Sequence, residues 1–210
     1  MLPTDHALLA DLAEVVDDTR EQCCNPWACP MVLLGHSMGG LVASRFVAGR
    51  LRPVEGLVLS SPALDPGLSG AQKLLIGALY RLAPNLAVGN GLDASKLSHD
   101  PAVAAAYLAD PRNHDRISAR LARFIANNGP RVLAAAPRWR VPTLLMYAGA
   151  DSLVRPAGSK AFAAAAPRDK VHSHAFDGLY HEIFNEADPS AVFGTLKAWL
   201  DVQAPLPRAV

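Results

Sequence analysis

One short segment constrains this chain more than any other: Gly35-His36-Ser37-Met38-Gly39-Gly40, directly after the apolar residues 31–34. The apolar run predicts a short buried strand, and the apolar spacing after Gly39 predicts a helix. A serine at such a strand–turn–helix corner sits in a strained turn, and glycines two positions on either side leave room where the strand and the helix cross. The serine hydroxyl then projects from the end of a sheet, and the following backbone N–H can donate to an oxyanion. We therefore predict that Ser37 is a nucleophile.

The rest of the chain supplies the frame for such a corner. Further apolar segments predict buried strands at 56–60, 142–149 and 171–176. Amphipathic spacing predicts helices at about 8–19, 156–166 and 188–202. Strands that alternate with helices favour a parallel sheet covered on both faces, so we expect an α/β fold.

The middle of the chain differs in its pattern of apolar and loop-forming residues. From residue 63 to 140, helical segments alternate with loops rich in Pro, Gly, Asn and Asp, and no strand signal is convincing. We expect core segments at 1–62 and 141–210, with a helical lid inserted at 63–140. The most apolar part of this insertion is residues 74–82.

A serine hydroxyl needs a base, and the base needs an acid that orients it. Asp151 follows the predicted strand 142–149, and His181 follows the strand 171–176, so both lie where parallel sheets place their ligands. Two simpler explanations stay open, because Asp151 could only cap the following turn and His181 could be a surface residue. Asp177 is a rival acid, which we interpret as a turn residue.

Other candidates for the site are weaker. Ser60 and Ser61 end a strand but have no flanking glycines. His172 and His174 alternate on a strand, which places them on one face without a chemical role. We expect His36 to pack inside the corner rather than to react.

Composition and charge narrow the classes of function. Half of the 210 residues are apolar and the net charge is +1 without a basic block, which argues against a nucleic-acid partner. The first residues lack the pattern of a secretory signal, and no stretch is apolar enough to span a membrane, so a cytoplasmic location is expected. Cys23, Cys24 and Cys29 lie in one predicted loop around residues 23–30 and match no zinc-binding spacing.

Three motifs in order, G-H-S-M-G-G, A-G-A-D-S-L-V and D-G-L-Y-H-E-I-F-N-E, resemble the monoacylglycerol lipase/lysophospholipase group of the α/β-hydrolases, of the serine aminopeptidase S33 type. The resemblance implies Ser37 as nucleophile, His181 as general base and Asp151 as its orienting acid. It also implies the Met38 N–H as an oxyanion donor and a lid helix that lines the acyl channel with Leu75, Leu79 and Leu82. Neither a cofactor nor a metal is implied.

The chain departs from that family before the serine corner. Members begin with several strands and a His-Gly segment that supplies a second oxyanion donor, whereas only about thirty residues precede this corner and none of them forms His-Gly. We therefore expect an N-terminally truncated hydrolase whose nucleophile strand is an exposed edge. Loss of one oxyanion donor typically costs about a hundredfold to a thousandfold in rate.

The expected function is hydrolysis of a monoacylglycerol or lysophospholipid ester through an acyl-enzyme. Two alternatives stay open: a catalytically impaired remnant, and a related hydrolase with peptidase, haloperoxidase-like or general esterase activity. The expected partner is a small-molecule lipid ester. For the apolar residues 74–82 we favour packing against the core over transient contact with a membrane surface. The sequence leaves the oligomeric state open.

Overall fold

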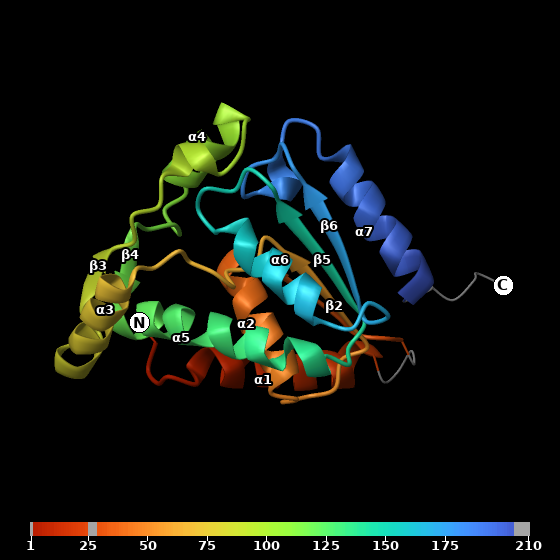
Figure 1. Cartoon of the computed structure of the whole chain (residues 1–210), viewed down its shortest axis with the longest axis horizontal. Coiled ribbons are helices and arrows are strands. Elements are labelled where there is room, and N and C mark those ends of the chain that lie inside the picture. The colour runs from red at the N-terminus through yellow and green to blue at the C-terminus, as the bar shows by residue number, and fades with distance from the viewer. Residues whose placement is uncertain (1, 25–28, 204–210) are drawn as a thin grey trace.

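A computed structural model describes residues 2–24 and 29–203 (Figure 1). Its main sheet is parallel, with the strand order β1-β2-β5-β6. These strands are β1 (Val32–His36), β2 (Gly56–Ser60), β5 (Thr143–Ala148) and β6 (Val171–Phe176). Each coincides with a strand predicted from the sequence, so the expectation of an α/β fold is confirmed.

Helices connect and cover the strands. Their bounds are α1 (Ala7–Thr19), α2 (Ser37–Ala48), α3 (Gly70–Leu82), α4 (Pro101–Ala109), α5 (Ala119–Ala135), α6 (Pro156–Ala165) and α7 (Ser190–Gln203). Several begin at a side chain that accepts a backbone N–H: the Ser69 hydroxyl caps α3, Asp100 caps α4 and Ser118 caps α5. Short helical turns complete the chain as η1 (Arg20–Cys24), η2 (Ala94–Lys96), η3 (Ala136–Arg138) and η4 (Ile183–Asn185).

The sheet buries a different apolar layer on each face. Leu57, Leu59 and Leu145 point to the face that α1, α2, α5 and α6 cover. Val58 and Leu144 point to the opposite face, where α7 contributes its buried apolar side chains. This alternation is the period-2 pattern of strands buried on both sides. The carboxyl ends of all four strands therefore meet at one edge, between the two layers.

Strand β1 forms one margin of the sheet. Within the described residues it pairs with β2 alone, and its Leu34 side chain is 54% exposed. Leu33 points the other way and packs against the core under α1 and α2. The apolar Leu34 side chain is therefore exposed to solvent at this edge of the sheet, as expected for an edge strand.

Residues 63–140, expected as a helical lid, contain two strands that the sequence analysis missed, and their helix α5 packs on the sheet as part of the core. β3 (Ala87–Gly89) pairs antiparallel with β4 (Arg116–Ser118), so the expectation of a purely helical insertion is wrong. Strands of three residues are too short to show an alternating pattern, which is why the residues gave no signal. The segment around Cys23 also differs, because η1 carries a helical turn through Cys24 where a loop was expected; residues 25–28 of that loop lie outside the described residues.

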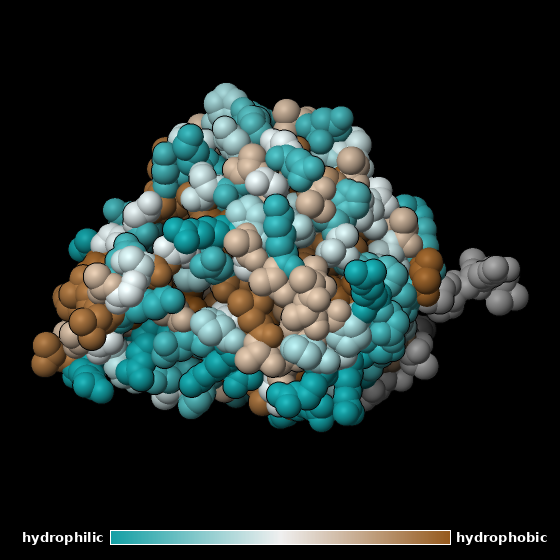
Figure 2. Space-filling model, in the orientation of Figure 1, coloured by the Kyte–Doolittle hydropathy of each residue, from teal (hydrophilic) through white to brown (hydrophobic). Residues whose placement is uncertain are grey.

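Helix α3 is an exposed apolar element. It has no buried residue, and Leu74, Leu75 and Leu82 are among its exposed side chains. Figure 2 shows hydrophobic side chains gathered at the end of the molecule where α3 lies. In the described part of the chain, no helix combines the length and the apolar character needed to cross a membrane.

Candidate active site

Ser37 lies at a sharp corner between β1 and α2. Its φ angle is +52°, in the left-handed region that residues other than glycine seldom adopt. The Ser37 carbonyl accepts a hydrogen bond from the Ala63 N–H at 2.9 Å, so the segment after β2 holds the corner. A strained non-glycine residue that its surroundings hold in place is typical of a functional position.

Two glycines allow the strand and the helix to meet at this corner. A Cβ atom on Gly35 would lie 2.7 Å from the Gly39 carbonyl oxygen, and one on Gly40 would lie 2.8 Å from the Pro62 side chain. Gly39 differs from the expectation, because a Cβ atom there would meet nothing within 4 Å. The close crossing therefore depends on Gly35 and Gly40, whereas the Cβ position of Gly39 faces open space.

Asp151 and His181 meet at the carboxyl ends of β5 and β6. Asp151 Oδ2 accepts a hydrogen bond from His181 Nδ1 at 2.6 Å, and both side chains are buried. Asp151 Oδ1 accepts the backbone N–H groups of Leu153 and Val154, each at 2.9 Å. The Asp151 carboxylate thus caps the following turn with one oxygen and bonds His181 with the other. The two roles that the sequence offered as alternatives are therefore both present.

The rival residues lie elsewhere or are already bonded. Asp177 is exposed, and its backbone packs against Gly149. Ser60 and Ser61 are buried, with the Ser60 hydroxyl bonded to His36 and the Ser61 hydroxyl accepting the Ala148 N–H. These contacts give the two serines structural roles at the end of β2.

A second contact joins the serine corner to the histidine loop. The His36 ring lies 4.8 Å from the His181 ring, centroid to centroid, and His36 Nε2 lies 3.1 Å from Glu182 Oε1. The contact with His36 lowers the pKa of Glu182 below its usual value, against the opposing effect of burial. Sequence analysis expected His36 only to pack. It did not single out Glu182, although Glu182 directly follows His181 in the motif.

Glu186 anchors the insertion to the same loop. Its buried carboxylate accepts the Tyr180 N–H at 2.6 Å and the His99 N–H at 3.0 Å, and it also bonds the His99 ring. Burial by itself raises the pKa of Glu186. The backbone and side-chain hydrogen bonds have the larger combined effect, so the pKa lies below its usual value. The Ser98 hydroxyl and the Leu97 carbonyl make further bonds to residues 182–186. Sequence analysis did not single out Glu186, because this anchor joins residues that are far apart in the chain.

The predicted acyl-channel residues lie on the exposed insertion. Leu75 and Leu82 are 58% and 85% exposed, and Leu79 is half-buried. Their role in binding an acyl chain stays a prediction. Among the described side chains, no cluster of three His, Cys, Asp or Glu residues could hold a metal ion.

Comparison with known proteins gives a consistent assignment. The family model for serine aminopeptidase, S33 matches residues 2–188. The chain is 34% identical over 199 residues to the monoacylglycerol lipase of Mycolicibacterium smegmatis, spanning 91% of this chain and 71% of that protein. It is also 34% identical over 177 residues to phospholipase YtpA of Bacillus subtilis, spanning 82% and 68%. The crystal structure of Paleococcus ferrophilus monoacylglycerol lipase matches with a TM-score of 0.83 at 31% identity, covering 93% of this chain and 76% of that one.

Proposed function

This chain belongs to the serine aminopeptidase S33 family of α/β-hydrolases and is a carboxylic ester hydrolase, and we propose that its chemistry is carried by Ser37, His181 and Asp151. The observation that carries the proposal is the 2.6 Å bond between His181 Nδ1 and Asp151 Oδ2, with the His181 ring 4.8 Å from the ring of His36 at the serine corner. A buried carboxylate on Nδ1 fixes the tautomer that leaves Nε2 as the base.

The proposed reaction proceeds in two halves. Ser37 Oγ attacks the ester carbonyl while His181 Nε2 takes the hydroxyl proton, and the imidazolium then gives that proton to the leaving alcohol. Water attacks the resulting acyl-enzyme with His181 again as base, which releases the fatty acid and restores Ser37. The Met38 N–H, at the first turn of α2 where backbone donors lack helical partners, stabilises the oxyanion.

For the substrate we propose a single-chain lipid ester, in the first place a monoacylglycerol. Two of the relatives described above are monoacylglycerol lipases. A phospholipid ester is the second candidate, because phospholipase YtpA is equally similar at 34% identity. The apolar side chains of Leu75, Leu79 and Leu82 supply a surface that fits an acyl chain rather than a polar head group.

A fluorophosphonate probe tests the nucleophile directly. The wild-type protein should be labelled, Ser37→Ala should not, and the exposed control Ser173→Ala should be labelled like the wild type. The same proteins should be assayed on a monoacylglycerol, on a lysophospholipid and on an amino-acid amide. Equal labelling of wild type and Ser37→Ala would contradict the proposed nucleophile. A well-folded wild type that neither takes up the probe nor hydrolyses any of the three substrates would favour the impaired remnant.

The acyl-binding surface needs a separate test. The double variant Leu75→Ser/Leu82→Ser should lower kcat/KM for long-chain esters while leaving short-chain esters unchanged, because the proposed channel places α3 against the far part of a long acyl chain. Val202→Ser, a comparably exposed apolar residue on α7, is the matched control. An equal loss on short and long esters would argue against an acyl channel along α3.

A further inference from the structure

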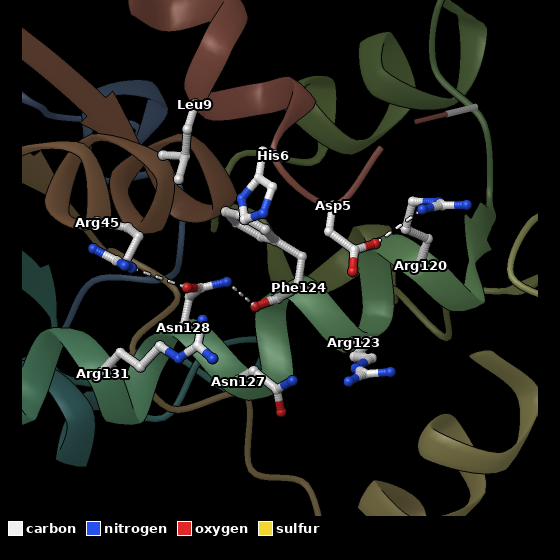
Figure 3. A pocket seen from close by; sticks show the side chains of 10 residues that line it. All are labelled: Asp5, His6, Leu9, Arg45, Arg120, Arg123, Phe124, Asn127, Asn128 and Arg131. Atoms are coloured by element: carbon white, nitrogen blue, oxygen red, sulfur yellow. Dashed lines mark hydrogen bonds and ion pairs between the residues drawn. The ribbon is translucent and has the colours of Figure 1, made fainter. Parts of the chain in front are cut away.

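A small cationic cavity lies away from the serine corner. It has a volume of about 170 Å³ and lies between the start of α1, the last turn of α2 and one face of α5 (Figure 3). Arg45 of α2 lines it, eight residues after Ser37, which places it about 12 Å further along the helix axis. The cavity is therefore distinct from the proposed catalytic site.

Charge is the unusual property of this cavity. Its lining includes the four arginines Arg45, Arg120, Arg123 and Arg131 but a single carboxylate, Asp5. Arg120, Arg123, Asn127 and Arg131 follow one another at helical spacing, so they share one face of α5. Like charges gathered around one cavity repel each other, and a bound anion relieves that cost.

The two ends of the cavity differ in how their charges are balanced. At one end, Arg120 donates to Asp5 at 2.9 Å, Tyr80 donates to the same carboxylate, and Arg123 stacks on the Tyr80 ring at 3.9 Å. At this end Asp5 therefore balances one of the two arginines, the other lies against the Tyr80 ring, and Tyr80 ties the group to α3. Figure 3 shows Arg45, Arg131 and Asn128 grouped at the other side of the cavity, away from Asp5.

Arg45 and Arg131 are the two arginines at the end of the cavity away from its one carboxylate, Asp5. Neither makes an ion pair with a carboxylate among the described residues. Arg45 Nε donates to Asn128 Oδ1 at 3.2 Å, and Asn128 Nδ2 donates to the Phe124 carbonyl, so the guanidinium is positioned by a buried amide. The terminal nitrogens of Arg45 and the whole fork of Arg131 remain for a ligand.

We propose that this cavity binds a phosphate group between Arg45 and Arg131. A phosphate has enough oxygens to bond two guanidinium forks at once, whereas one arginine already satisfies a carboxylate. The cavity is below the size of a pocket for a drug-sized ligand, roughly 300 Å³ or more, so it fits a compact anionic group and not an acyl chain. The phosphate could belong to a soluble ester or to a lipid head group.

Titration calorimetry of the whole protein with inorganic phosphate, at constant ionic strength, tests the site. The wild type should bind phosphate and not acetate. Arg131→Gln should weaken binding about tenfold or more, because a charge-assisted bond is lost, and Arg131→Lys should fall between the two. The exposed Arg168→Gln removes the same charge elsewhere and should bind like the wild type. Arg131 is exposed, so its substitution should leave folding intact, which circular dichroism verifies.

Flotation with vesicles separates the two sources of phosphate. Phosphatidylcholine vesicles with and without phosphatidic acid are compared for the wild type, Arg131→Gln and Arg168→Gln. Arg131-dependent binding to phosphatidic acid that free phosphate competes away assigns a lipid head group, and Arg131-dependent binding of free phosphate alone assigns a soluble ester. If Arg131→Gln behaves like Arg168→Gln in both measurements, or if acetate binds as well as phosphate, the proposal is wrong. None of these measurements depends on ester hydrolysis, so they stand apart from the proposed function.

Discussion

Glu182 Oε1 lies 3.1 Å from His36 Nε2, so the residue after His181 contacts the residue before Ser37. The His36 ring also bonds the Ser60 hydroxyl through Nδ1 at 3.0 Å, which ties both to the end of β2. Two loops that are far apart in the sequence are thereby fixed relative to each other. The distance between a nucleophile and its base is set by such contacts as much as by the two residues themselves.

We predict that Glu182→Ala lowers kcat about tenfold to a hundredfold with little change in KM, because a small shift between nucleophile and base slows the chemical step. Glu182→Gln keeps an oxygen that can accept from His36 and should retain most of the activity. Steady-state kinetics on a soluble short-chain ester separate kcat from KM. Equal activity in Glu182→Ala and wild type would show that the contact does not position the site.

The assignment of Asp151 as the acid can be tested against its rival, Asp177. We predict that Asp151→Asn lowers kcat roughly ten-thousand-fold, because the amide no longer selects the tautomer with a free Nε2. Asp177→Asn, at the exposed rival position, should leave kcat within about twofold of wild type, as expected of a surface residue. The measurement is the rate of ester hydrolysis by purified protein. The reverse ranking of the two variants would transfer the role of the acid to Asp177.

The two glycines that flank Ser37 should respond in opposite ways to alanine. Gly35→Ala brings a methyl group within 2.7 Å of the Gly39 carbonyl, and we predict a loss of about 1–3 kcal/mol in the free energy of unfolding. Gly39→Ala meets nothing within 4 Å and lies in α2, so it should stabilise the protein by about 0.5–1 kcal/mol. Urea unfolding of both variants measures the difference. A similar loss for both would mean that the helix and the strand cross differently.

Glu186 should make stability depend on pH in the acidic range. Its pKa is lower in the folded protein than the usual 4.5, so the folded state favours the carboxylate. The stabilisation is complete above that usual value and is lost as the pH falls through the lower folded-state pKa. At pH 7 we predict that Glu186→Gln reduces the free energy of unfolding by about 2 kcal/mol, since bonds to a charged acceptor are lost.

The gap between Glu186→Gln and wild type should shrink as the pH falls below 4.5, because wild type then loses the charge as well. Urea unfolding at pH 7 and near pH 4 measures this gap. A gap that stays constant over that range would assign the effect to packing instead of to the carboxylate.

The strands and the serine corner could be predicted because their signals are local. The apolar run before Gly35, the glycines and the order of Ser37, Asp151 and His181 are all visible in the sequence. The contacts of Glu186 with His99 could not be predicted, because they join residues more than eighty positions apart. The cationic cavity could not be predicted for the same reason. Arg45 and Arg131 are far apart in the sequence and come together only because α2 packs against α5.

The bonds from Glu186 to Ser98 and His99 also constrain how the insertion can move. A flap attached only where it leaves and rejoins the core could swing as one rigid body. This segment is fixed to the core along α5 and also near its middle, where residues 97–99 bond to the histidine loop. A motion of this segment that keeps these bonds therefore displaces the residues on either side of 97–99 and leaves 97–99 in place.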